Sequence, residues 1–179
     1  MQAARSVAAI GFVVFSSSVV HANEPAVEPV QIETASAVER VAHVSPRPWL
    51  HSTVRPVLGA KIEAGFAIAV QRVRDNAGCQ ALFSGLGSDG VEMLHSSLYF
   101  AMPTTFDGRS ICERAHAATF VGEPTTFVCR RFQWLSDEQA AMVLIHEALH
   151  HAGLTEFPQD PEAMSSGRIT RMVERSCGP

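Results

Sequence analysis

The sequence predicts a compact α+β domain, in which helices pack on a small β-hairpin or sheet, from three observations. The first is an apolar stripe at helical spacing over residues 57–77. The second is a pair of strand-like segments at 117–121 and 125–132. The third is a strongly apolar helix over 137–152, which we expect to lie at the centre of the domain.

Residues 57–77 are expected to form an amphipathic helix that packs on the core. Apolar residues recur there at intervals of three and four, so that they share one helix face. These residues are Ile62, Phe66, Ala69, Val70 and Val73. Gly78 follows, and we expect it to end the helix in the left-handed conformation. The pattern of residues 91–103 predicts neither a helix nor a strand.

The two strand-like segments are rich in Thr, Phe and Val. Gly122, Glu123 and Pro124 separate them, which predicts a hairpin with a tight turn.

The boundaries of the third element are clear from the sequence. Ser136 and Gln139 form a capping box that begins a helix at Asp137, and Gly153 is expected to end it. A last helix over 166–176 is expected to pack behind it through Ile169 and Val173.

The first 22 residues are typical of a signal peptide. Arg5 precedes an apolar run over 7–20, and Val20-His21-Ala22 provides the small residues that a signal peptidase accepts. An uncleaved membrane anchor is the alternative, but the run is shorter than the roughly 18–20 apolar residues that span a bilayer. We therefore expect a secreted or periplasmic protein.

The predicted mature chain has an arm and one domain. Residues 23–56 are rich in Pro, Val, Glu and Ala, which favours a flexible N-terminal arm with one short helix near 35–44. Residues 57–179 would form the domain.

Charge and hydropathy exclude two kinds of partner. The net charge is −4, and the 14 basic residues, of which only Lys61 is a lysine, form no patch. Nucleic acid is therefore not expected as a partner, because phosphate binding needs concentrated positive charge. No segment after the predicted signal peptide is long and apolar enough for stable membrane insertion. The oligomeric state stays open.

Four cysteines are expected to form two disulfides in an oxidising compartment. Three pairings are possible, and we favour Cys79 with Cys112 and Cys129 with Cys177. A four-thiolate zinc site is less consistent with the sequence, because no two cysteines have the close spacing of such sites.

The helix over 137–152 carries the residues with a clear chemical pattern. His146 and His150 are one turn apart, about 40° from each other around the helix, so both imidazoles can bind one ion. Zinc (Zn²⁺) accepts such ligands, and Glu147 is placed to accept a proton from a metal-bound water.

The other residues of this helix are mostly apolar, which is typical of a buried helix. They include Ala140, Ala141, Met142, Val143, Leu144, Ile145, Ala148, Leu149 and Ala152. Burying two histidines and a carboxylate there would be costly unless a metal and its water satisfied them.

The segment from His146 to Glu156 resembles the active-site helix of the zincin metallopeptidases. His146, Glu147 and His150 match their HExxH motif, and Gly153 stands where metzincins turn the chain towards a third ligand. Glu156 occupies the position of that ligand, which is histidine in metzincins, so the chain is similar to an HExxHxxGxxE variant. The GTxD motif of the aspzincins is absent.

The resemblance implies a zincin-like fold and zinc-dependent hydrolysis of a peptide or protein substrate. It also implies that the strand at 127–132, which precedes the helix, is an edge strand that binds the substrate backbone. His146, His150 and Glu156 would hold zinc, and Glu147 would act as the general base.

The third ligand has several candidates downstream of the motif. Glu156 is favoured by its spacing from Gly153, and Glu162 is next, since gluzincins take a glutamate from a following helix. Asp160 and Glu174 are further candidates.

The remaining histidines and the only tyrosine receive no place in the metal site. His151 would point away from the ion, and we expect it either to support the ligands from behind or to pack elsewhere. His95 and His116 have no partner at ligand spacing. No role is assigned to Tyr99.

Two other classes of protein remain open at this stage. One is a non-catalytic, zinc-stabilised secreted binding module, and the other is a disulfide-stabilised domain without metal.

Overall fold

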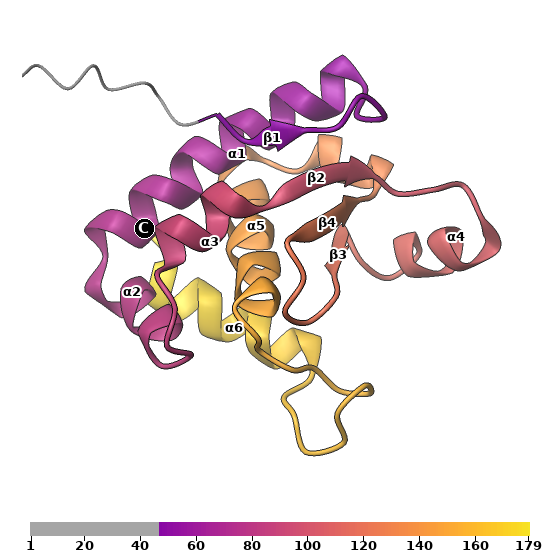
Figure 1. Cartoon of the computed structure of the whole chain (residues 1–179). Coiled ribbons are helices and arrows are strands. Elements are labelled where there is room, and N and C mark those ends of the chain that lie inside the picture. Colours follow the sequence, from indigo (N-terminus) through magenta and orange to yellow (C-terminus); the bar gives the residue numbers. More distant parts are fainter. Residues whose placement is uncertain (1–46) are drawn as a thin grey trace, which may run out of the picture. The chain divides into compact units, whose positions relative to one another are not determined.

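The computed structural model describes residues 47–179, with the side chain of Phe106 left out. Within this part, six α-helices pack on a four-stranded mixed sheet, which confirms the predicted α+β class (Figure 1). The predicted signal peptide over 1–22 and the predicted short helix near 35–44 lie outside the described residues.

The elements follow one another in mixed order along the chain. The helices are α1 (Pro56–Asp75), α2 (Ala77–Ser84), α3 (Gly90–Ser96), α4 (Phe106–Cys112), α5 (Asp137–His151) and α6 (Ser166–Cys177). The strands are β1 (Trp49–Leu50), β2 (Leu98–Ala101), β3 (Ala117–Thr119) and β4 (Thr125–Val128), and η1 (Arg130–Trp134) is a 3₁₀ helix.

The sheet has the strand order β1-β2-β4-β3. Strands β1 and β4 both pair in parallel with β2, and β3 pairs antiparallel with β4. The predicted hairpin is therefore confirmed, but its second strand ends at Val128 and the chain continues as η1. Phe132 of η1 is fully buried, and its packing in the core accounts for the early end of the strand.

The expectation of an edge strand at 127–132 is wrong. Residues Thr125–Val128 lie inside the sheet, because β2 pairs with the side of β4 that the hairpin leaves free. The strand at the edge next to β4 is β3. Strand β2 is only four residues long, and its sequence shows no alternation of apolar and polar residues. The pairing of β2 with β4 was therefore not predicted.

The folded domain begins earlier than the predicted boundary at residue 57. Trp49 and Leu50 pair with Leu98 and Tyr99, so the last part of the predicted arm belongs to the sheet. A strand of two residues is too short to produce a recognisable pattern.

Helix α1 spans nearly the predicted range, but Gly78 does not end it. Asn76 ends α1 in an extended conformation, and its side chain accepts hydrogen bonds from the backbone N–H groups of Gly78 and Cys79. Asn76 is thus the N-cap of α2, and Gly78 lies inside that second helix.

Helix α5 lies in the middle of the domain, between α1, α6 and the sheet (Figure 1). The predicted capping box of Ser136 and Gln139 is present. At Gly65 of α1, a Cβ atom would lie 2.7 Å from the Cβ of Ala140, so the two helices approach closely at small residues. Gly153 lies just after α5 with a φ of 102°, a positive value that glycine adopts more readily than other residues do.

The disulfides differ from the favoured pairing. Cys79 is bonded to Cys177, which joins α2 to the end of α6, and Cys112 is bonded to Cys129, which joins α4 to the end of β4. The pairing follows from the packing of α2 on α6, a contact between residues 98 positions apart that sequence spacing does not reveal. Because all four cysteines are paired, a four-thiolate zinc site does not form.

The two disulfides should differ in their effect on stability. Replacing Cys79 and Cys177 together by alanine is expected to lower the free energy of unfolding by about 4–5 kcal/mol, and replacing Cys112 and Cys129 by about 3 kcal/mol. A disulfide that closes a longer loop removes more conformational entropy from the unfolded chain. Urea unfolding of both double variants measures the difference, and a larger loss for the Cys112 and Cys129 pair would contradict it.

Two features of the described part bear on the compartment. The disulfides are compatible with an oxidising environment. None of the helices in residues 47–179 combines the length and the apolar composition needed to cross a bilayer.

Candidate metal centre

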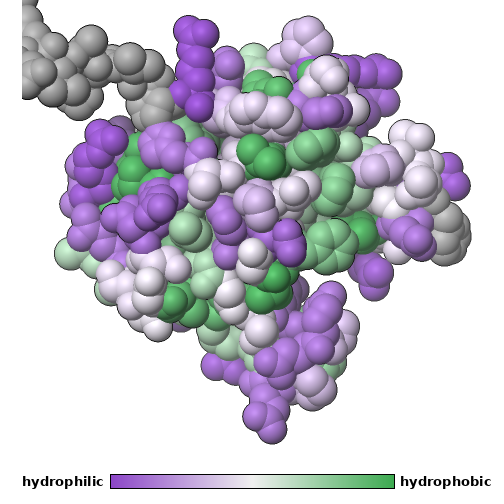
Figure 2. Space-filling view, viewed as in Figure 1, coloured by the Kyte–Doolittle hydropathy of each residue, from purple (hydrophilic) through white to green (hydrophobic). Residues whose placement is uncertain are grey.

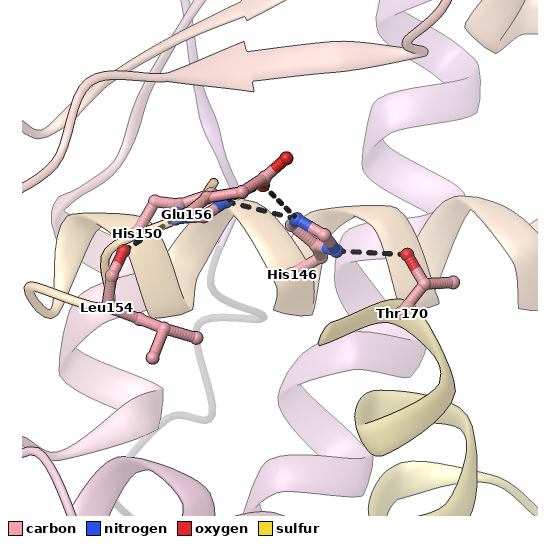
Figure 3. A network of polar contacts seen from close by, with 5 residues as sticks. All are labelled: His146, His150, Leu154, Glu156 and Thr170. Carbon is pink, nitrogen blue, oxygen red and sulfur yellow. Dashed lines mark hydrogen bonds and ion pairs between the residues drawn. The ribbon is translucent and has the colours of Figure 1, made fainter. Parts of the chain in front are cut away.

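The two histidines of the motif point in the same direction from the buried α5. Their side chains turn towards each other, and the two Nε2 atoms are 3.1 Å apart (Figure 3). His146 is 8% exposed and His150 is 5% exposed. The helix therefore presents two buried nitrogen donors at one point.

Glu156 reaches this point from the loop after α5. The chain turns at Gly153, and the Leu154 N–H donates to the Leu149 carbonyl, so that the loop returns along the end of the helix. The Glu156 Oε2 atom is 3.0 Å from the Nε2 of His150 and 3.5 Å from the Nε2 of His146. These three residues are a group that could bind a metal ion.

The alternative third donors lie elsewhere. Glu162 and Glu174 are exposed and are not part of the group. Asp160 accepts hydrogen bonds from the Thr155 hydroxyl and the Glu162 N–H, and it thereby holds the loop that carries Glu156.

The three donor atoms have nearly the spacing that a tetrahedral ion requires. They form a triangle with sides of 3.0, 3.1 and 3.5 Å. Ligands about 2.0–2.2 Å from a tetrahedral zinc ion are about 3.3–3.6 Å from one another. The side chains therefore need to move by only a few tenths of an ångström, on the order of the tolerance for such sites.

The second nitrogen of each ring is held by a hydrogen bond. The His150 Nδ1 atom is 2.7 Å from the Leu154 carbonyl oxygen, which can only accept, so Nδ1 carries the hydrogen. This tautomer leaves Nε2 as the nitrogen that can bind an ion. His146 Nδ1 is 3.2 Å from the Thr170 hydroxyl of α6 (Figure 3). Such partners are typical of histidines that bind metals.

The carboxylate of Glu156 is suited to bind a cation at neutral pH. Burial alone would raise its pKa, but the hydrogen bond with His146 and the charges of His150 and His146 outweigh burial. The pKa of Glu156 is therefore lowered from its ordinary value. An ionised Glu156 beside the two Nε2 atoms forms a donor set that suits a positive ion.

Glu147 lies beside this group, towards the sheet. It is 6% exposed, and its Oε2 atom is buried without a hydrogen-bond partner in the described residues. Burial raises the pKa of Glu147, against the charges of His146 and His150 and a hydrogen bond with Thr119. A buried carboxylate with one unpartnered oxygen and a raised pKa is the kind of group from which general bases are drawn.

The sequence analysis missed the residues that support the site. Thr170, the Leu154 carbonyl and Thr119 lie on three different elements, and no motif marks them. The apolar stripe of Ile169 and Val173, both fully buried, indicated that α6 packs on the core but not that Thr170 would reach His146.

Within residues 47–179, the other histidines are not part of the group. His151 points towards α3, where its Nδ1 is 3.2 Å from the Met93 carbonyl oxygen and 3.3 Å from the Ser97 hydroxyl. His95 packs edge-on against Phe66. Tyr99 is buried, and its pKa is raised mainly by burial.

Comparison with protein-family models, with curated proteins and with solved structures found no match to this chain. The fold, the disulfides and the donor group define the class of this protein: an α+β domain with two disulfides and a candidate metal centre on its central helix.

Proposed function

We propose that this protein is a secreted zinc-dependent peptidase of the zincin type. The observation that carries the proposal is the triangle of His146, His150 and Glu156 donors with a buried carboxylate, Glu147, beside it. Two imidazoles and one carboxylate are the ligand set of one class of catalytic zinc sites. The segment with signal-peptide character at 1–22 and the two disulfides support export.

Zinc is the ion that this donor set favours. Imidazole nitrogens suit transition metals, whereas magnesium and calcium prefer sites built from oxygen atoms alone. When bound, zinc supplies a Lewis acid that polarises a carbonyl group and lowers the pKa of water to about 7.

Glu147 is the residue that we assign to proton transfer. It would take the proton of the attacking water and return it to the nitrogen of the leaving amine. Its raised pKa lies closer to neutral pH than that of an ordinary glutamate, and a group whose pKa is near the working pH can both accept and donate a proton. Thr119 would orient one side of its carboxylate.

Strand β3 is the surface that we assign to the substrate backbone. It is the last strand of the sheet, with β4 on its inner side. Its turn is attached to α5, because the Gly122 N–H donates to the His150 carbonyl oxygen at 2.9 Å. A peptide that added to the free edge of β3 would therefore lie next to the metal donors and Glu147.

The number of donors favours catalysis over a purely structural site. Structural zinc is almost always held by four protein ligands, whereas catalytic zinc keeps one position open. Within residues 47–179, the group at this point contains three donors. A non-catalytic, zinc-stabilised binding module is thus the less favoured function.

Metal removal tests the proposal. The purified protein is expected to contain about one zinc ion per chain and to hydrolyse an unfolded protein substrate. A chelator should abolish hydrolysis, and added zinc should restore it. Zinc without hydrolysis would instead favour the binding module, and the absence of bound metal would reject the metal centre.

A further inference from the structure

Three arginines of α6 line a pocket on the surface of the domain. Along the sequence the basic residues are scattered, but Arg168, Arg171 and Arg175 are three and four residues apart and therefore lie on one side of the helix. Met172 of the same helix and Met164, just before it, complete the lining of this pocket, which has a volume of about 320 Å³. We call it the arginine pocket.

The arginine pocket combines positive charge with an apolar part. The three arginines are exposed, whereas Met164 and Met172 are half-buried and form its less exposed lining. Methionine is a flexible side chain that adapts its shape to apolar groups. Hydrophilic side chains gather over the loop between α5 and α6, which leads to the pocket at Met164 (Figure 2). The pocket therefore suits a ligand that joins a negative group to a short apolar stem.

The charges of the arginine pocket are not neutralised by the domain. Among residues 47–179, Arg72 is the only arginine that forms an ion pair. Glu174 is the one acidic residue of α6, and it lines a different pocket, beside Arg72 and Glu138. Three guanidinium groups are therefore exposed without a carboxylate partner in the described part of the chain.

The position of these charges on α6 is electrostatically unfavourable. Arg168 belongs to the first turn, and the guanidinium group of Arg171 reaches back to Gly167 in the same turn, where its Nη1 atom would be 3.5 Å from an added Cβ. This turn is the positive end of the helix dipole, and it contains no acidic residue. Glu156 accepts a hydrogen bond from Ser166 there, but it is one of the three candidate metal donors. A bound anion would therefore relieve a repulsion between like charges.

The arginine pocket is separate from the candidate metal centre, although α6 contributes to both. Thr170 turns its hydroxyl towards His146 (Figure 3). At about 100° per residue, the three arginines lie about 100–160° further around the helix than Thr170. A ligand in the pocket would therefore leave the metal donors free.

We propose that the arginine pocket binds acidic side chains of an extended polypeptide partner. A guanidinium group donates paired hydrogen bonds to a carboxylate, and the methylene stem of an aspartate or glutamate would pack on the two methionines. Side chains on one side of an extended chain repeat about every 6.6–6.8 Å, and the three arginines span about 10 Å along the helix axis. They therefore match two acidic residues at alternate positions. The inference does not depend on the proposed peptidase function.

The size and shape of the pocket favour a peptide over a membrane or a nucleic acid. Basic surfaces that attach to anionic lipids have clusters of about four to eight basic residues, and a flat bilayer would contact the exposed arginines but not the less exposed methionines. Nucleic acids also require many phosphate contacts, and the net charge of the chain is −4. Two carboxylates on a peptide need no more than the three arginines present.

The test measures the binding of a charged peptide. The probe is a fluorescent 12-residue peptide with glutamate at alternate positions, compared with a peptide that has glutamine at those positions. Both are titrated into the full chain carrying Glu147→Gln, which keeps the peptide from being cleaved if the proposed function is correct. Arg168→Gln/Arg171→Gln/Arg175→Gln in that background removes the three charges with a residue that helices tolerate.

The matched control removes three exposed arginines elsewhere. Arg47→Gln/Arg74→Gln/Arg114→Gln changes residues that also form no ion pair within 47–179, and it gives the same net charge as the pocket variant. A difference between the two triple variants therefore reports the place of the charges and not their number. Circular dichroism melts establish that both variants fold, and Arg171→Gln alone provides a milder second variant.

We expect the glutamate peptide to bind at least about tenfold more tightly than the glutamine peptide, because one hydrogen bond to a charged group is already worth about that factor. The pocket variant should lose this preference, Arg171→Gln should lose part of it, and the control should keep it. Equal binding of the two peptides, or equal affinities of pocket variant and control, would overturn the inference. So would arginine-dependent binding of phosphatidylglycerol vesicles or of single-stranded DNA without binding of the glutamate peptide. Because the measurement needs no hydrolysis, the pocket and the proposed peptidase succeed or fail separately.

Discussion

The Glu147→Gln variant is expected to hydrolyse peptides about 10²–10⁴-fold more slowly, measured as kcat/KM, because it loses the group that accepts the proton of the attacking water. Its zinc content should not change, since Glu147 is not one of the three converging donors. The neutral amide has nearly the same shape, and burial already disfavours the charge of the native carboxylate. The fold should therefore be retained.

The control for this variant is Glu123→Gln, which neutralises an exposed carboxylate in the turn between β3 and β4. It should retain ordinary activity, which separates a loss of the base from a general change of charge near the site. Steady-state kinetics and metal analysis on the same preparations check both expectations. Full activity of Glu147→Gln would mean that another group moves the proton.

The Glu156→Gln variant is expected to bind zinc more than about 100-fold more weakly than the unsubstituted protein. Loss of a partner that only hydrogen-bonds to a ligand already costs about 10–100-fold, and loss of a direct ligand should cost more. The pKa of Glu156 is lowered, so at neutral pH the substitution removes a negative charge from the group. Competition with a chromophoric chelator measures the affinity.

Two further variants distinguish a direct ligand from its surroundings. Glu162→Gln changes the rival carboxylate, which is exposed, and should leave zinc affinity unchanged. Thr170→Val removes the partner of His146 and should weaken binding by about 10–100-fold. A larger loss of zinc affinity for Glu162→Gln than for Glu156→Gln would assign the third ligand to Glu162.

The α+β class and the main helices were predictable because their signals are local. The capping box of Ser136 and Gln139 acts within one turn, and the apolar stripe of α1 repeats over 20 residues. The edge strand and the pairing of the two disulfides were predicted wrongly. Both depend on β2 and α2, whose short sequences do not show what they pack against.

The sequence by itself determined that His146 and His150 share one face of α5, because four residues make about one helical turn whatever surrounds the helix. Only the tertiary structure decided which side chains meet them. The position of Glu156 depends on the turn at Gly153 and on a loop held by Asp160. The contact of Thr170 with His146 depends on the packing of α6, and the position of Thr119 beside α5 depends on the strand order. The contacts of Thr170 and Thr119 join segments far apart in the chain, and their free energy comes from burial of the whole core and not from any local pattern.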